Sequence, residues 1–371
     1  MNRRSGTRAV FNGTGHTRHG VRWSKALTAE KHGAVGVLLA SEPRRDHVSA
    51  FDPPPKTAGG RTERASAPLQ ALDGYGPHIP LFSVNEEVVV KLLKSAGKTP
   101  AELQESIDRQ LAPVSMALPG VVVEMRVVNR KGDRRLSANV AGLIEGANGS
   151  LRNETVLVTA HYDHLGVVKG KVYPGANDNA SGTAAVMELA RMFSHPSARP
   201  KRSLLFVVFG SEEEGLLGSY FYTEKPLRPL ATTRGVLNLD MIGRDEAHIP
   251  QSEGAVDIPP DTSNEVNLVA AFYSPDLETL IRTENERVGL RISMKFDRDH
   301  SMNALFRCDH FPFLLRNVPA IWFFGGWHPG YHEASDTVEK INFVKLEKIV
   351  RLAYLSARAL ADGGEPPRFR P

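Results

Sequence analysis

The chain of 371 residues is 41% apolar and 24% charged, a composition that excludes a fibrous or wholly disordered protein. Its formal net charge of +4 comes from scattered Lys and Arg without a nucleic-acid-binding motif, so we expect no nucleic-acid partner. A single cysteine, Cys308, excludes an internal disulfide and a thiolate-rich zinc site, and no apolar run approaches the roughly 20 residues of a transmembrane helix.

The first third of the chain is predicted to form a small α/β module. Residues 23–31 are expected to be helical, and residues 33–40 (GAVGVLLA) and 79–84 to be buried strands. The intervening residues 41–78 are rich in Pro, Gly and charge, which predicts a long loop. Residues 1–22 are basic, lack the apolar stretch of a signal peptide and are predicted to be disordered.

A helix start is encoded at Thr99, which is placed to cap the helix. Pro100 then occupies the first helical position, and Glu102 completes a capping box with Thr99. Apolar residues recur every four positions and predict one buried helix face, formed by Leu103, Ile107 and Leu111.

The pattern changes after this helix. Residues 121–128 and 137–144 are predicted to be two strands of a hairpin around the turn 129–133. We therefore place a domain boundary near Pro119, which assigns residues 23–118 to one domain and residues 119–363 to a second.

The second domain alternates short apolar strands with helices. The strands are of the kind that is buried on both faces, and they cover residues 155–160, 203–209, 235–239 and 320–324. Helices are predicted at 183–193 and at 344–360, where apolar residues recur at helical spacing. This alternation predicts a three-layer α/β/α domain. The Pro-rich residues 364–371 are predicted to be a disordered tail.

Side chains that can bind a metal follow each strand. His161 comes directly after the first strand, the glutamates 212–214 follow the second, and Asp240 follows the third, while the fourth leads through a Gly/Pro loop to Tyr331 and His332. Ligands of open α/β sheets bind beyond the carboxyl ends of the strands. We therefore expect these side chains to meet at one edge of the sheet.

A further acid, Asp178, lies in the Gly- and Asn-rich turn 175–182 (GANDNASG), directly before a helix for which Ser181 is a candidate N-cap. Imidazole and carboxylate donors suit zinc, whereas calcium and magnesium favour oxygen-only sites. Two histidines and three carboxylates suffice for two metals if one carboxylate bridges them.

Five segments in order, HYDHLG, PGANDNASG, SEEEGLLGS, NLDMIGR and YHEASDT, resemble the successive signatures of the family 28 metallopeptidases. That family contains di-zinc aminopeptidases and glutamate carboxypeptidases, and the match in order extends over residues 119–342. The resemblance implies a mixed central sheet, two Zn²⁺ per chain and peptide substrates.

Residue by residue, the resemblance implies that His161 and Asp240 bind one metal and that Glu213 and His332 bind the other. Asp178 would bridge the two metals. This assignment aligns the glutamate pair of the family on the following GLLGS segment, which leaves Glu214 as the variable residue.

Three further residues receive catalytic roles from the resemblance. Glu212 would be the general base that takes a proton from a water held between the metals, and Asp163 would orient a liganding histidine. Tyr331 would polarise the substrate carbonyl, although a buried tyrosine hydrogen bond is an equal alternative. His164 is expected to be structural, and the Cys308-Asp309-His310 segment to support the pocket.

An aminopeptidase is the predicted function. A carboxypeptidase of the glutamate carboxypeptidase type would need a basic anchor, for which Arg244 and Arg298 are candidates. A cyclase acting on N-terminal Gln is a further enzymatic alternative, and a catalytically inactive, receptor-like binding protein is the alternative from another class. The complete set of ligands and base argues against the inactive protein.

The N-terminal domain resembles a protease-associated domain through SKALTAEKHGAVGVLLA and HIPLFSVNEE. Family members carry more chain ahead of this point, including an export signal, so we expect either a truncated start or an abbreviated domain. Family habit implies a secreted or periplasmic protein. The oligomeric state is not predicted.

Overall fold

The structure is a computed structural model that describes residues 18–20, 22–40, 43, 78–128, 136–250, 252, 256–297 and 302–370. The chain forms two compact units, Met1–Arg135 with His300–Met302, and Leu136–Asp299 with Asn303–Pro371. The predicted turn 129–133, nearly all of the loop 41–78 and most of the segment 1–22 lie outside the described residues. The domain assignments made from the sequence stay predictions.

The N-terminal unit is a small α/β arrangement, as predicted. Its elements are α1 (Arg22–Lys31), β1 (Val37–Ala40), β2 (Leu81–Val84), α2 (Glu86–Leu93) and α3 (Pro100–Gln110). The two strands pair in parallel, from Val37 with Leu81 to Ala40 with Val84. The prediction that both strands are buried was wrong, because every residue in them is half-buried or exposed. A strand with one described neighbour has less cover than a strand inside a wide sheet.

The helix start at Thr99 is confirmed. The Thr99 hydroxyl accepts a hydrogen bond from the Glu102 amide at 3.2 Å, and the Glu102 carboxylate accepts one from the Thr99 amide at 2.8 Å. The prediction of a buried face was wrong, because Leu103 and Ile107 are half-buried, and Leu111 is 45% exposed and takes the left-handed conformation that ends the helix.

The predicted hairpin is wrong. Residues 121–128 form no strand, although Val122 and its neighbours have high β propensity. The segment instead approaches β1 through a side chain, since a Cβ added at Gly36 would lie 2.1 Å from Cε of Met125. Propensity alone does not form a strand, because a strand also needs a partner with free backbone groups in register.

A seven-stranded mixed sheet forms the centre of the second unit, with the order β10-β9-β11-β8-β4-β7-β3. Its strands are β3 (Val140–Ile144), β4 (Thr155–His161), β7 (Ser203–Phe209), β8 (Thr233–Asp240), β9 (Glu265–Val269), β10 (Arg291–Ser293) and β11 (Ala320–Phe324). β7, β4, β8 and β11 run parallel, while β3 and β9 are antiparallel to β7 and β11. The predicted strand at 137–144 is thus β3, and its partner is β7. A separate two-stranded ribbon pairs β5 (Gly166–Val168) with β6 (Lys171–Tyr173).

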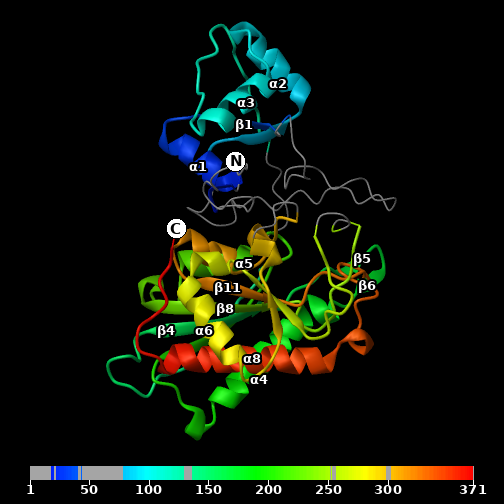
Figure 1. The fold of residues 1–371 in the computed structure, drawn as a ribbon. Helices are drawn as coiled ribbons and strands as arrows, with labels where there is room; N and C mark the ends of the chain where they lie inside the picture. Colours follow the sequence, from blue (N-terminus) through cyan, green and yellow to red (C-terminus); the bar gives the residue numbers. More distant parts are fainter. Residues whose placement is uncertain are drawn as a thin grey trace. The chain divides into compact units, whose positions relative to one another are not determined.

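Helices cover both faces of this sheet, which confirms the three-layer α/β/α architecture. α4 (Gly182–Phe193) and α8 (Phe343–Asp362) lie on one face, where α6 (Pro275–Asn285) packs against α8, and α5 (Leu217–Glu224) lies on the other (Figure 1). Alternate residues of a strand point to opposite faces of the sheet, so each strand contacts helices on both faces. Leu204 and Phe206 of β7 join the large core cluster with α4 and α8, whereas Phe209 contacts Tyr222 of α5 and Phe313 of α7 (Phe311–Leu315).

The segment after α8 packs against the second unit instead of being disordered as predicted. The ring of Phe369 stacks on Tyr273 with 5.4 Å between centroids, and the Arg370 amide donates to the Tyr273 carbonyl at 2.7 Å. The Arg368 guanidinium also donates to Asp276 at 2.9 Å. The Pro-rich composition therefore reflects an extended path over the surface.

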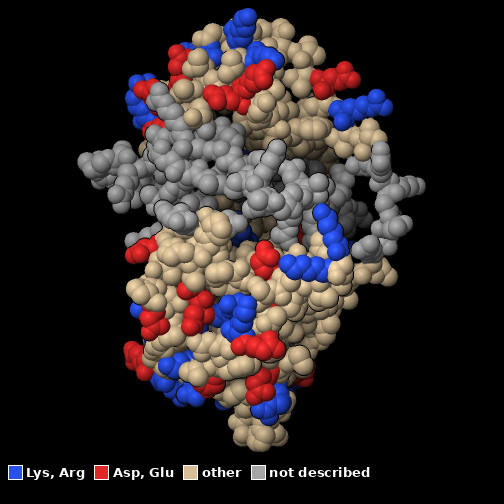
Figure 2. All heavy atoms as spheres, turned by 90° about the vertical axis from the view of Figure 1, so that its right-hand side faces the viewer, with Lys and Arg blue, Asp and Glu red and all other residues tan. Residues whose placement is uncertain are grey.

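Acidic and basic side chains are interspersed over the face of the molecule that Figure 2 shows. Among the described residues, no helix combines the length and the apolar character needed to cross a membrane. The absence of a nucleic-acid partner stays a prediction.

Candidate metal centre

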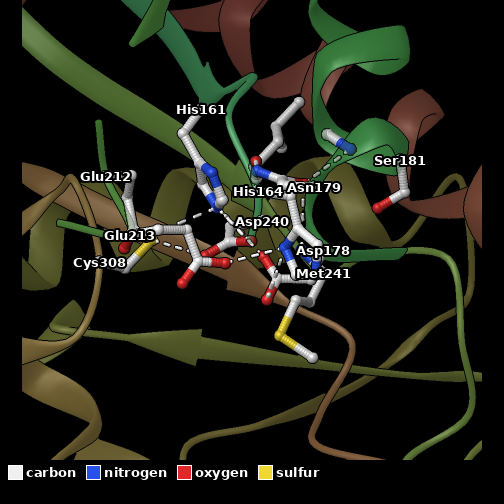
Figure 3. Close-up of polar contacts among 12 residues, drawn as sticks. His161, His164, Asp178, Asn179, Ser181, Glu212, Glu213, Asp240, Met241 and Cys308 are labelled. Carbon is white, nitrogen blue, oxygen red and sulfur yellow. Dashed lines mark hydrogen bonds and ion pairs between the residues drawn. The ribbon is translucent and has the colours of Figure 1, made fainter. Parts of the chain in front are cut away.

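The site lies at the carboxyl edge of the parallel strands, as the sequence predicts. His161 is the last residue of β4 and Asp240 the last residue of β8, and their side chains converge on Asp178 (Figure 3). Nε2 of His161 lies 3.3 Å from Oδ1 of Asp178 and 3.3 Å from Oδ1 of Asp240. All three side chains are buried, so their polar atoms have little access to water.

A second cluster lies on the other side of Asp178. Nε2 of His332 is 3.2 Å from Oδ2 of Asp178 and 3.2 Å from Oε2 of Glu213. Asp178 therefore presents one carboxylate oxygen to each cluster. This is the arrangement that a bridging carboxylate needs.

The distances between these donor atoms fit zinc. A tetrahedral ion with ligands at about 2.0–2.2 Å holds its ligand atoms roughly 3.3 Å apart. The four separations of 3.2 and 3.3 Å around Asp178 agree with that value. Among the described residues, the buried Oδ1 of Asp240 makes no well-aligned hydrogen bond, which is costly unless a cation satisfies it. The five predicted ligands are thus brought together in two sets that suit zinc.

Asp336 holds the turn that carries Asp178. Its Oδ2 accepts hydrogen bonds from the backbone amides of Asn177 at 2.9 Å and Asp178 at 3.1 Å. The side-chain oxygen of Asn177 in turn accepts from the Gly243 amide at 2.7 Å, which ties the turn to the segment after β8. Polar contacts on both sides therefore fix the position of the bridging residue.

Ser181 does not cap α4 through its side chain, in contrast to the sequence prediction. Its hydroxyl donates to the Asn177 carbonyl at 2.7 Å and accepts from the Ile242 amide at 3.2 Å. The Asn179 side chain instead accepts from the Gly182 amide at 2.9 Å. The Asp178–Asn179 peptide bond is cis. Asn179 caps α4 in place of Ser181, because the Ser181 hydroxyl holds the turn against the segment that follows β8.

Asp163 contacts the glutamate segment more closely than it contacts a histidine. Its two carboxylate oxygens accept from the backbone amides of Glu212 at 3.0 Å and Glu213 at 3.2 Å. Nδ1 of His161 lies 3.8 Å from the Asp163 carboxylate but 3.1 Å from the Asp163 carbonyl oxygen. The predicted orienting role of Asp163 on the histidine stays a prediction, and the structure adds a contact to the residue proposed as base.

The three consecutive glutamates occupy different positions. Glu213 faces His332, while Oε2 of Glu212 lies 3.9 Å from Nε2 of His161, and Glu214 is exposed. Burial raises the pKa of Glu212 well above its ordinary value, against the opposing positive charge of His161. A carboxylate with a raised pKa beside the metal donors is a suitable proton acceptor.

His164 is a member of the cluster that the sequence interpretation missed. Its Nδ1 lies 2.8 Å from Oε1 of Glu213 and 3.8 Å from Oδ2 of Asp178, although neither ring nitrogen makes a well-aligned hydrogen bond among the described residues. Gly175 makes room for the ring, because a Cβ there would lie 2.5 Å from Cγ of His164. One sequence feature could have predicted that His164 belongs to this cluster: it follows His161 by three residues, just after the end of the same strand.

Cys308 supports a metal donor, and it is buried as predicted. Its thiol donates to Oδ2 of Asp240 at 2.9 Å and accepts from the Asn238 side chain at 2.9 Å. Behind it, burial raises the pKa of Asp309 to about 7 and lowers that of His310 to about 3. These neighbours shape the site and lie behind the donor atoms.

A pocket opens onto the donor atoms. Its wall consists of Asp178, Glu212, Asp240, Met241, Arg307, Trp322, Trp327, Tyr331 and His332. The Tyr331 ring stacks on His332 with 3.9 Å between centroids, and burial raises the Tyr331 pKa well above its ordinary value. A protonated phenol thus faces the space where a substrate would lie.

The profile of Peptidase family M28 matches residues 139–356, which is more than half of the chain. The chain belongs to peptidase family M28. The matched segment contains the donors of both clusters, so the resemblance inferred from the five motifs is confirmed.

Individual relatives cover the M28 chain to different extents. It is 29% identical over 224 residues to Aminopeptidase YwaD of Bacillus subtilis, which covers 57% of this chain and 42% of that protein. It is 27% identical over 374 residues to a probable zinc metalloprotease of Pyrenophora teres f. teres, covering 90% of this chain and 72% of the relative. A solved zinc aminopeptidase from Bacillus subtilis has 25% identity and a TM-score of 0.46, covering 63% of this chain and 53% of that chain. The match thus spans less than half the length of YwaD, and the protease-associated domain stays a prediction.

Protons compete with metal at the M28 site. Burial alone would lower the pKa of both imidazoles, but Glu212 and Asp240 raise the pKa of His161, and Asp178 and Glu213 raise that of His332 to about 9. Both histidines therefore carry protons at neutral pH in the metal-free protein. Zinc requires the neutral imidazole, so binding must release those protons.

We expect the apparent zinc affinity to rise with pH between 6 and 8, by up to about tenfold per pH unit for each proton released. Competition with a chromophoric chelator at several pH values measures this slope. The slope should shrink in His332→Gln, which removes one of the competing protons. An affinity of wild-type protein that does not change with pH would contradict the proposed protonation.

His164→Ala should weaken binding at the Glu213 cluster by about 10- to 100-fold, because removing a group that holds a ligand typically costs that much affinity. Zinc titration should show one site weakened and the other retained. The exposed His195 is a matched control, because its ring contacts Ser197 and no metal donor among the described residues. His195→Ala should leave both sites unchanged. Equal zinc binding in the two variants would exclude a role of His164 at the site.

Proposed function

We propose that this M28 peptidase is a two-zinc aminopeptidase that hydrolyses the first peptide bond of its substrates. The observation that carries the proposal is the Asp178 carboxylate, whose two oxygens face separate histidine–carboxylate pairs at 3.2 and 3.3 Å. Membership of family M28 supports a peptidase, and the name of the Bacillus relative supports an aminopeptidase.

The five donors divide into two sets that share Asp178. His161 and Asp240 would hold one zinc ion, and Glu213 and His332 the other. When bound, the ions supply Lewis acidity toward the substrate carbonyl and lower the pKa of water toward neutrality. Each set keeps fewer protein donors than a closed structural site, which leaves room for substrate.

Glu212 acts as the general base in this proposal. Its buried carboxylate accepts a proton from water as the water oxygen bonds to the scissile carbonyl carbon. When the C–N bond breaks, Glu212 delivers that proton to the leaving amine. Asp163 fixes the backbone of Glu212 through the 3.0 Å hydrogen bond, and the Tyr331 hydroxyl stabilises the developing oxyanion.

The carboxypeptidase alternative is weaker. Its anchor candidate Arg244 lies 3.8 Å from Asp336, the residue that holds the Asp178 turn, and is absent from the described wall of the metal-site pocket. The other candidate, Arg298, lies outside the described residues. Export of the enzyme, which family habit implies, is part of the proposal.

Glu212→Gln should lower kcat/KM by about 10²- to 10⁴-fold, the typical contribution of a general base, while zinc content stays at the wild-type level. Glu214→Gln is the matched control, because Glu214 is the exposed neighbour, and it should retain activity. Steady-state kinetics and metal analysis of both variants test the assignment. If Glu214→Gln were the inactive variant, the base would have to be reassigned within the three glutamates.

The aminopeptidase assignment predicts cleavage of aminoacyl p-nitroanilides and no cleavage of N-acetylated peptides that end in glutamate. The zinc-loaded protein should release nitroaniline, and treatment with a chelator should abolish that release. The opposite substrate choice would favour a carboxypeptidase. Cyclisation of N-terminal Gln without hydrolysis would favour the cyclase alternative.

A further inference from the structure

Among the described residues, Arg307 is the only Lys or Arg in the wall of the metal-site pocket. Its side chain is exposed, and in the part of the chain that the structure describes its guanidinium has no ion-pair partner. Most arginines near the surface of this unit are paired, such as Arg316 with Glu224 at 2.7 Å. An unpaired cation beside the donor atoms is therefore available to a ligand.

The backbone of Arg307 is anchored to the metal centre. The next residue, Cys308, donates its thiol hydrogen bond to the ligand Asp240 at 2.9 Å. The indole of Trp322, another residue of the pocket wall, donates to the Asp240 carbonyl at 3.1 Å. Arg307 is thus next in the chain to a residue that contacts a metal donor.

An aromatic platform restrains the guanidinium. It lies over the ring of Trp327 at 5.8 Å from the centroid, a cation–π arrangement. Trp327 is buried and packs edge-on against Phe296 at 4.9 Å and Phe324 at 4.8 Å, so the platform itself is fixed. The positive charge is therefore held at the pocket wall, which lowers the entropic cost of using it.

The charges of the loaded site make Arg307 the dominant uncompensated group. Two divalent cations balance the four carboxylates of Asp178, Glu212, Glu213 and Asp240. The Arg307 charge also acts on Tyr331, where it opposes the effect of burial on the tyrosine pKa. Among the described residues of the wall, the polar groups beyond the metal donors are the Glu212 carboxylate, Arg307 and the Tyr331 hydroxyl, and the rest is apolar or aromatic.

We propose that Arg307 binds a carboxylate of the substrate, so that the enzyme prefers peptides with Glu or Asp as the N-terminal residue. The inference rests on the proposed aminopeptidase function. Arg307 stands in the wall of the pocket beside the metal donors, and an arginine pairs with a carboxylate through parallel hydrogen bonds. The same cation disfavours Lys and Arg side chains by repulsion.

The test compares Glu-, Gln-, Leu- and Lys-p-nitroanilide on the zinc-loaded full chain. These substrates carry no α-carboxylate, so only the side chain can use Arg307. We expect kcat/KM for Glu to exceed that for Gln by at least about tenfold. Arg307→Gln should bring this ratio close to one, and Arg307→Glu should reverse the order of Glu and Lys. Arg316→Gln is the matched control and should keep the wild-type ratio.

The outcomes separate the two proposals. Hydrolysis of Leu-p-nitroanilide with equal rates for Glu and Gln would overturn the role of Arg307 and leave the aminopeptidase intact. A complete lack of anilide hydrolysis at full zinc occupancy would overturn the aminopeptidase. If Arg307→Gln weakened cleavage of the dipeptide Ala-Ala as much as that of Glu-p-nitroanilide, Arg307 would bind a terminal carboxylate and the preference for acidic side chains would be wrong.

Discussion

The position of one carboxylate, that of Asp178, determines the rest of the site. A single side chain must present its two oxygens to two different histidines, His161 at the end of β4 and His332 in the loop after β11. A regular strand could not place it there, because the space between these donors lies beyond the edge of the sheet. The Asn-rich turn does so, and Asp336 and Asn177 fix it by accepting backbone amides. The strands of the sheet thus direct their donor side chains toward one edge, and the turn places the Asp178 carboxylate between the two sets of donors.

The same arrangement concentrates negative charge in a buried place. Burial raises the pKa of Asp240 and of Glu212, whereas the imidazoles of His161 and His332 hold that of Asp178 below its ordinary value despite burial. Such a cluster opposes folding unless positive charge enters it. Cations at the two donor sets would relieve that cost, so metal binding and the stability of this edge of the sheet are coupled.

The strands that carry metal-binding side chains to the edge of the sheet could be predicted from the sequence. β4, β7, β8 and β11 could be recognised because buried parallel strands are apolar throughout, and a polar residue directly after each one stands out. The segment 121–128 carries a similar apolar signal, yet it forms no strand, since pairing depends on a distant partner that local composition does not encode.

Side-chain partners were the least predictable part. Ser181 was expected to cap a helix and instead braces the turn, and Asp163 holds the glutamate backbone, a contact that the sequence did not predict. The hydrogen-bond partner of each side chain depends on which other segment of the chain lies next to it in the fold. His164 was expected to be structural, and Arg307 was given no role, because the contacts that distinguish them come from residues far away in the chain.

A polar chain runs from the interior of the sheet to the metal donors. Thr159 donates to Asn238 at 2.7 Å, Asn238 donates to Cys308, and Cys308 donates to Asp240. Burial raises the pKa of the Cys308 thiol well above its ordinary value, and the adjacent carboxylate of Asp240 adds to that shift. Because the thiolate is the form that reacts readily with oxidants and electrophiles, burial makes this thiol less reactive than an exposed one. The single cysteine can therefore serve beside a metal ligand without depending on a reducing environment.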